Sequence, residues 1–134
     1  MILVDTSCWV EFYRGAGDPG IQEAVAQAIE GGEAATCGVI RVEILGFIAR
    51  KKEYSLVAED FAALHELEIS SGDYERAVEL GRSLRATGGT VPATDLIIAA
   101  VAVGHGAELL HADRHFETIA ASTSLRQRCL ARGR

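Results

Sequence analysis

The segment from residue 96 to residue 103 constrains the fold most, because its eight side chains, LIIAAVAV, are all apolar. A helix of this composition has no polar side to present to water, so other elements must cover it on every side. Gly104 and Gly106 follow it and mark its end. The sequence therefore predicts a layered fold with this helix at its centre and a loop over residues 87–94 in front of it.

Short apolar runs alternate with helical patterns along the rest of the chain. The predicted strands are residues 2–4, 34–37, 67–69 and 108–110, with residues 122–125 as a fifth candidate. The predicted helices run from a cap at Thr6 or Ser7 to Tyr13, over 19–29 after Asp18, over 38–50, over 53–66, from 72 to 85, and onward from Asp113. Strands that alternate with helices form parallel sheets through right-handed crossovers. We therefore expect one domain over residues 1–134, a three-layer α/β/α sandwich with a mainly parallel sheet of four or five strands.

Composition supports a packed core and argues against disorder, since 49% of the residues are hydrophobic and 24% are charged. No run is long enough to predict a membrane span, and the apolar start of the chain meets Asp5 too early for a signal peptide. Cys8, Cys37 and Cys129 are odd in number and widely spaced, which fits neither a disulfide framework nor a zinc ribbon. We expect a protein of the reducing cytoplasm, with the cysteines acting as small buried hydrophobic residues.

Charge is distributed unevenly around a net value of −6. Four arginines follow Glu117, the last acid, so residues 122–134 form a basic tail and the remainder is strongly acidic; they are Arg126, Arg128, Arg132 and Arg134. A body this acidic is a poor general binder of polyanions. Any contact with nucleic acid should therefore be local.

Four acidic residues lie in apolar surroundings, namely Asp5, Glu43, Asp95 and Asp113. Three of them stand where a strand ends or a helix begins, so each could simply cap a helix. Asp95, however, precedes the apolar helix and has no solvated side to occupy. Several carboxylates in one pocket favour a divalent cation, and oxygen ligands suit Mg²⁺ or Mn²⁺. Such ions can activate water and stabilise the leaving oxygen in phosphodiester cleavage.

Four segments that contain these acids resemble, in order, the motifs of PIN-domain ribonucleases. The segments are MILVDTSCWV from residue 1, VEIL from residue 42, PATDLIIAA from residue 92 and LLHADRHF from residue 109. The size of the chain and its start at the first motif are similar to the VapC-type toxins of bacterial toxin–antitoxin pairs. The match covers almost the whole chain, and the order and spacing of the motifs carry it.

The resemblance implies a metal-dependent endoribonuclease that acts as the toxin of such a pair. It assigns the catalytic metal site to Asp5, Glu43, Asp95 and Asp113, with Mg²⁺ or Mn²⁺ as cofactor. Thr6, Ser7 and Thr94 become candidates for orienting the acids, and Arg14, Arg41 and Arg114 for contacting RNA. It also implies an RNA substrate, a homodimer and a cognate antitoxin protein that covers the acidic pocket.

Other classes of function fit the residues less well. A zinc hydrolase would use His111, Asp113 and His115, with His105 nearby, but a helix from Asp113 would point the two flanking histidines apart. A signalling receiver needs a lysine near the late strands, and the chain has lysine only at positions 51 and 52. A haloacid-dehalogenase-like phosphatase needs a second aspartate where Ser7 stands. A catalytically silent interaction domain of the same fold remains an alternative, and we expect a structural role for His115.

Overall fold

The computed structural model describes residues 1–130, and five parallel strands form one sheet in the order β3-β2-β1-β4-β5. The strands are β1 (Ile2–Val4), β2 (Ala34–Thr36), β3 (His65–Glu66), β4 (Glu108–His111) and β5 (Gln127–Cys129). The helices are α1 (Thr6–Tyr13), α2 (Pro19–Glu30), α3 (Gly38–Leu45), α4 (Lys51–Ala62), α5 (Ser71–Ala86), α6 (Ala93–His105) and α7 (His115–Ala120). The predicted parallel α/β architecture is confirmed.

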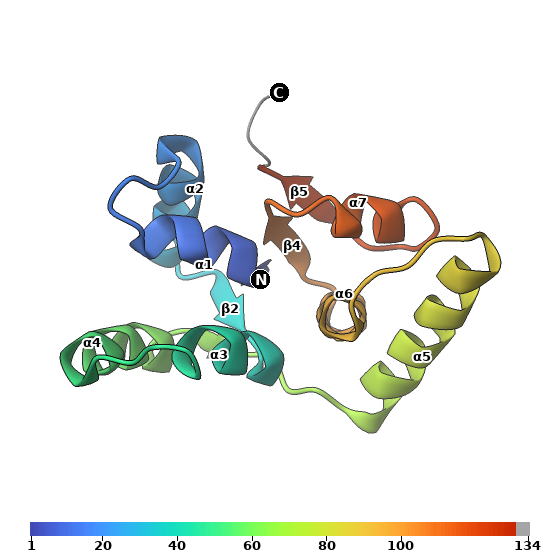
Figure 1. Cartoon of the computed structure of the whole chain (residues 1–134), viewed down its shortest axis with the longest axis horizontal. Coiled ribbons are helices and arrows are strands. Elements are labelled where there is room, and N and C mark those ends of the chain that lie inside the picture. The colour runs from blue at the N-terminus through green and yellow to red at the C-terminus, as the bar shows by residue number, and fades with distance from the viewer. Residues whose placement is uncertain (131–134) are drawn as a thin grey trace.

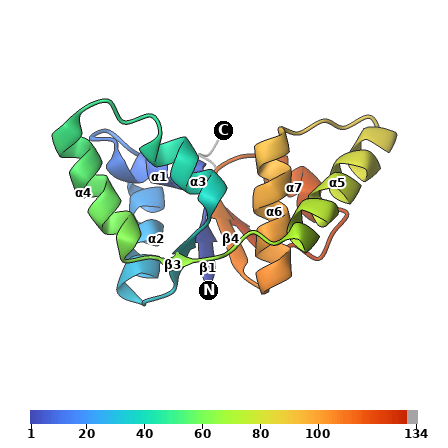
Figure 2. The same cartoon turned by 90° about the horizontal axis from the view of Figure 1, so that it is seen from below.

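The helices cover both faces of the sheet. Figure 2 shows α1 to α4 on one side of the strands and α5 to α7 on the other, which makes three layers. From β1 the chain crosses toward β2 and β3, and from β3 it returns over the opposite face to β4 and β5 (Figure 1). The direction of the crossovers therefore changes between β1 and β4, and ligands of open parallel sheets bind beside such a point, at the carboxyl ends of the strands.

The helix α6 is as central as its composition predicts. Ile98, Ala99, Val101 and Ala102 are fully buried, and α6 packs against α5, α7 and α3. It ends at Gly106, whose φ of 65° lies in the left-handed region that favours glycine. Gly104 lies inside the helix rather than at its end. This burial fixes the first turn of α6, and with it Asp95.

Local signals set most of the other boundaries. Asp18 caps α2 by accepting hydrogen bonds from the backbone of Gly20 and Ile21, with Pro19 at the first helical position. Ser70 and Asp73 form a capping box at the start of α5. The predicted helix over 38–50 is too long, because Gly46 caps α3 after Leu45.

Both edge strands lie away from their predicted positions. The third strand is His65–Glu66 rather than 67–69, because its pairing with β2 places His65 beside Ala35. The helix predicted over 53–66 therefore ends earlier, at Ala62. The fifth strand is Gln127–Cys129 rather than 122–125. Residues 122–125 instead lie in the connection that follows α7, where the Thr123 hydroxyl donates to the carbonyl of Ile119 and accepts from the backbone of Leu125.

The cysteines behave largely as predicted. Cys8 and Cys37 are fully buried in the core, Cys129 is half-buried, and none of the three forms a disulfide. Within residues 1–130, no helix is long and apolar enough to cross a membrane. The part of the predicted basic tail that contains Arg132 and Arg134 lies outside the described residues.

Candidate metal centre

Asp5 stands directly after β1 and is the N-cap of α1. Its Oδ2 accepts hydrogen bonds from the Ser7 backbone at 3.0 Å and from the Ser7 hydroxyl at 2.5 Å, so the predicted cap at Thr6 or Ser7 is wrong by one or two residues. Burial raises the pKa of Asp5, with Glu43 acting in the same direction, and the bonds from Ser7 oppose the shift. The Ser7 hydroxyl also accepts from the backbone of Ala112 at 3.0 Å. One side chain thus joins the ends of β1 and β4.

Glu43 lies on α3, half-buried, and is held by Thr6. The Thr6 hydroxyl donates to Glu43 Oε1 at 2.6 Å across a sequence separation of 37 residues. Thr6 therefore contacts a different acid from the one that Ser7 contacts. Thr6 and Ser7 both lie in the first turn of α1 and contact two separate carboxylates.

Asp95 lies in the first turn of α6 and is 8% exposed. Burial raises its pKa to about 6, and the negative charges of Asp113 and Asp5 add to that shift, while a hydrogen bond from His115 opposes it. Thr94 precedes it in the same turn, half-buried, and within residues 1–130 no hydrogen bond joins Thr94 to any of the four acids. A carboxylate that burial and like charges destabilise is one that a bound cation would stabilise.

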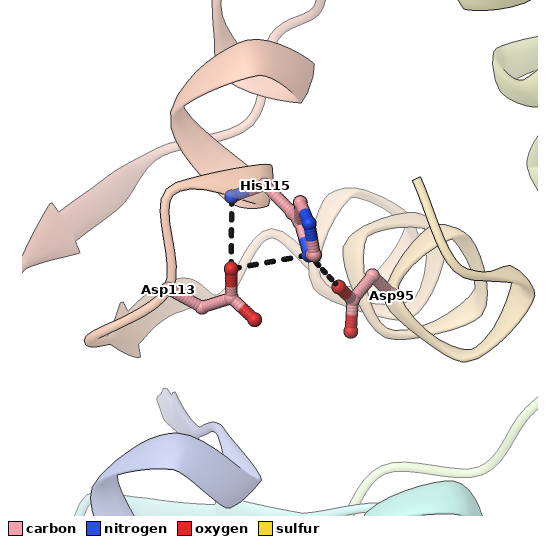
Figure 3. Close-up of side chains that lie close together, drawn as sticks. All are labelled: Asp95, Asp113 and His115. Carbon is pink, nitrogen blue, oxygen red and sulfur yellow. Dashed lines mark hydrogen bonds and ion pairs between the residues drawn. The ribbon is translucent and has the colours of Figure 1, made fainter. Parts of the chain in front are cut away.

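Asp113 lies in the connection between β4 and α7. Its Oδ1 accepts a hydrogen bond from the backbone of His115 at 2.9 Å, which sets the start of α7 at His115 rather than at Asp113. The same oxygen is 3.1 Å from His115 Nδ1. Figure 3 shows the imidazole of His115 between the two aspartates, with Nδ1 toward both.

The ligand atoms of Asp95, Asp113 and His115 all lie within 4.8 Å of one another. Asp5 and Glu43 are not part of this group in the described chain, although the charge of Asp5 acts on Asp95 and the charge of Glu43 acts on Asp5. Two of the four predicted acids thus meet directly, and the other two adjoin them electrostatically. The donor set of two carboxylates and one imidazole fits a divalent cation.

Sequence reasoning missed His115 as a site residue. The structure places its Nδ1 2.8 Å from Asp95 Oδ2, although its side chain is 45% exposed. The signal available in the sequence was its spacing, two residues after Asp113, at the beginning of a helix. Spacing alone could not predict that α6 would bring Asp95 to the same ring.

Most of this chain matches one known protein family. The PIN domain matches residues 2–122. The chain belongs to the PIN-domain family. Among individual PIN-domain proteins, Ribonuclease VapC11 of Mycobacterium tuberculosis is 33% identical over 128 residues, which cover 93% of this chain and 96% of that protein. The resemblance to VapC-type PIN domains is therefore confirmed.

Solved structures share the fold of this PIN domain at lower identity. The VapBC2 complex of Rickettsia felis, bound to a promoter DNA fragment, contains a chain with a TM-score of 0.76 and 18% identity, covering 96% of this chain and 98% of that chain. Mycobacterium tuberculosis VapC20, a toxin that cleaves the sarcin–ricin loop, gives a TM-score of 0.67 and 20% identity, covering 94% and 99%. These likenesses establish the fold.

The three arginines considered for RNA contact differ in their surroundings in this PIN domain. Arg14 pairs with Glu11 at 3.0 Å, and Arg41 lies 4.0 Å from Glu66. Arg114 is exposed and directly follows Asp113, as the cap residue of α7. Arg114 is therefore the arginine nearest in the chain to the acids that meet.

His111 is not part of the cluster formed by Asp95, Asp113 and His115. It is fully buried, its Nε2 lies 2.6 Å from Gln127 Oε1, and its Nδ1 accepts from the backbone of Asp113. Both ring nitrogens are thus engaged in holding β4 to β5 and to the following turn. A zinc site that uses both His111 and His115 is not formed.

Proposed function

We propose that this chain is a metal-dependent endoribonuclease and acts as the toxin of a toxin–antitoxin pair. The observation that carries the proposal is the meeting of the ligand atoms of Asp95, Asp113 and His115 within 4.8 Å of one another, with Asp5 directly after β1 acting on Asp95 through its charge. The 33% identity with Ribonuclease VapC11 over nearly the whole chain supports the same activity. The predicted single domain over 1–134 is part of this proposal.

The proposed cofactor is Mg²⁺ or Mn²⁺. Asp95 and Asp113 supply carboxylate oxygens. Burial raises the pKa of Asp95, the charges of Asp113 and Asp5 add to the shift, and a bound cation would offset both effects. When bound, such an ion supplies positive charge for the phosphate oxygens in the transition state and lowers the pKa of water.

In this proposal Asp5, Glu43, Asp95 and Asp113 are the catalytic acids. Asp95 and Asp113 hold the ion, while Asp5 and Glu43 complete the negative pocket from the opposite side. Ser7 orients Asp5 and Thr6 orients Glu43 through the hydrogen bonds described above. Thr94 is adjacent to Asp95 in the first turn of α6 and forms no hydrogen bond with it in the described part of the chain.

RNA is the proposed substrate, and arginines near the acids are its proposed contacts. Arg114 is the best placed of them, because it is exposed and adjacent to Asp113. Arg14 and Arg41 extend the positive charge on the side of α1 and α3, after exchange of their acidic partners for phosphate. The salt dependence of binding grows with the number of phosphates that cations contact, so a site with few cations predicts RNA binding that weakens only modestly with salt.

The proposed protein partners are a cognate antitoxin and a second copy of this chain. Apolar side chains of Val42, Phe47 and Leu56 are exposed on and between α3 and α4, which is typical of a protein-binding surface. Tyr74 and Val78 are exposed one turn apart on α5, on the opposite side of the sheet, and offer a face for a homodimer. We place the protein in the cytoplasm, as the widely spaced free cysteines predict.

The test of this function is cleavage of a mixed cellular RNA pool by the wild type and by Asp5→Asn, prepared identically. We expect the wild type to cut RNA when Mg²⁺ or Mn²⁺ is present, with at least a hundredfold loss of rate in Asp5→Asn, because a displaced catalytic group costs several kcal/mol of transition-state stabilisation. Ser122→Ala, an exposed change away from the site, is the matched control. Equal cleavage by all three proteins would overturn the assignment.

A further inference from the structure

The ring of His115 occupies the space between the two aspartates that meet. Its Nδ1 lies 2.8 Å from Asp95 Oδ2 and 3.1 Å from Asp113 Oδ1, and the other ring nitrogen points away from both carboxylates (Figure 3). Two anions thus converge on a single nitrogen. Nδ1 forms a hydrogen bond with Asp95 Oδ2 and lies within ion-pair distance of Asp113 Oδ1.

Nδ1 lies from each of the two carboxylate oxygens at the spacing of neighbouring ligands on one ion. Ligands about 2.1 Å from an octahedral cation, and at right angles, are about 3.0 Å apart. The two measured separations from Nδ1, 2.8 and 3.1 Å, bracket that value. Little rearrangement is needed for Nδ1 to change from hydrogen-bond partner to ligand, because the tautomer with its proton on Nε2 leaves a lone pair on Nδ1.

The backbone holds the nitrogen in this place. Asp113 Oδ1 accepts from the backbone N–H of His115, so the acid and the imidazole are fixed to each other at the first residue of α7. Phe116, the next residue, is fully buried and anchors that turn in the core. The backbone of His115 is therefore positioned by α7 independently of the contact between its ring and Asp95.

We propose that Nδ1 of His115 is a nitrogen ligand of the divalent ion and biases the site toward Mn²⁺ over Mg²⁺. Mg²⁺ dehydrates reluctantly and binds oxygen ligands almost exclusively. Mn²⁺ also favours oxygen ligands but, as a first-row transition metal, tolerates an imidazole ligand better than Mg²⁺ does. This inference rests on the proposed metal-dependent function and deepens it. Replacement of the nitrogen by an oxygen ligand should therefore change which metal is preferred, and not only how tightly a metal binds.

The test is pulsed electron paramagnetic resonance of Mn²⁺ bound to the full chain. A directly bound imidazole gives a ¹⁴N coupling to the manganese electrons, which an all-oxygen site lacks. We expect this coupling in the wild type and in His65→Asn, whose ring bonds the Gly32 carbonyl at 2.8 Å and lies outside the cluster. The coupling should be absent in His115→Asn, which retains an amide that can still donate to the aspartates.

Calorimetric titrations with Mn²⁺ and with Mg²⁺ provide the second readout. The Mn²⁺ dissociation constant of His115→Asn should rise at least tenfold, and that of Mg²⁺ should rise less. His115→Asp, which supplies an oxygen, should reduce the preference for Mn²⁺ at least tenfold.

The outcomes separate the two proposals. Bound Mn²⁺ without a ¹⁴N coupling, or with a coupling that persists in His115→Asn, would overturn the ligand role and leave the metal-dependent nuclease intact. Failure of the wild type to bind Mn²⁺ would overturn the ligand role as well, and absence of RNA cleavage in the same preparation would then count against the nuclease itself.

Discussion

Asp95 lies on the buried central helix, where burial disfavours the charged form of its carboxylate. Burial and the charges of Asp113 and Asp5 raise its pKa to about 6 from the ordinary 3.8. Between those values the folded protein binds more protons than the unfolded chain, so the free energy of unfolding falls as pH rises through this window. Above about pH 6 the ionisation of Asp95 lowers the free energy of unfolding no further. Asp5, whose pKa is also raised, acts in the same direction.

Urea unfolding in EDTA measures this effect. The wild type should lose roughly 2 kcal/mol more between pH 4.5 and pH 7 than Asp95→Asn, which cannot ionise at this position. At pH 7 the metal-free variant should therefore be the more stable protein. Parallel pH profiles for the two proteins would show that Asp95 is not destabilised in the folded state.

Ser7 links two carboxyl ends of the sheet with one hydroxyl. In Ser7→Ala the Asp5 carboxylate loses a donor at 2.5 Å and the backbone of Ala112 loses its acceptor at 3.0 Å. We expect destabilisation of about 2 kcal/mol, because a buried polar group is left without its partner. The control Ser122→Ala is exposed and should change stability by less than about 0.5 kcal/mol. Equal urea midpoints would exclude the linking role of Ser7.

At the scale of the element, the packing of α5 against α6 depends on a glycine. A Cβ added at Gly104 would overlap the carboxylate of Asp73, which belongs to the capping box of α5 and pairs with Arg76 at 3.2 Å. Gly104→Ala should therefore destabilise the protein by about 1–3 kcal/mol, although alanine favours a helix by about 1 kcal/mol.

Gly72 on α5 gives the matched control, because a Cβ there meets only the Ser70 hydroxyl at an ordinary 3.6 Å. Gly72→Ala should stabilise the protein by about 0.5–1 kcal/mol. Thermal unfolding of both variants distinguishes them by the sign of the change in Tm. A rise in Tm for Gly104→Ala would contradict the close approach of the two helices.

Elements with local signals were predictable from the sequence, and elements defined by pairing were not. The signal lies within each of three segments: the apolar run of β1, the Asp18-Pro19 start of α2, and the all-apolar residues 96–103 of α6. The edge strands β3 and β5 do not, because their positions follow from registers such as Ala35 with His65 and Leu109 with Gln127. The polar, exposed His65–Glu66 carries no strand pattern of its own.

The candidate site divides in the same way. Acids buried in apolar sequence could be identified because an isolated carboxylate there is costly. The partner of each acid could not, since Thr6 reaches Glu43 over 37 residues and His115 reaches Asp95 over 20. Those contacts depend on where α1, α3, α6 and α7 begin relative to one another, which only the packed sheet determines.

At the scale of the whole molecule, the proposal of one domain predicts a single cooperative unfolding transition. One sheet contains all five strands, and the buried core extends across both of its faces. Mn²⁺ at a hundred times its dissociation constant should add about 2.7 kcal/mol to the free energy of unfolding, because the ion binds the folded state. The same Mn²⁺ concentration should add much less to the free energy of unfolding of Asp95→Asn. Two separated transitions in calorimetry would contradict the single domain.

The central claim is that the ion held by Asp95 and Asp113 is the ion that enables RNA cleavage. The most direct measurement is the cleavage rate of one RNA substrate as a function of Mn²⁺ concentration, set beside the calorimetric dissociation constant of Mn²⁺ under the same conditions. We predict that half-maximal cleavage occurs at the dissociation constant in the wild type, and that Asp95→Asn loses binding and cleavage together. Cleavage by Asp95→Asn at the wild-type rate, or wild-type cleavage that persists in EDTA, would contradict the claim.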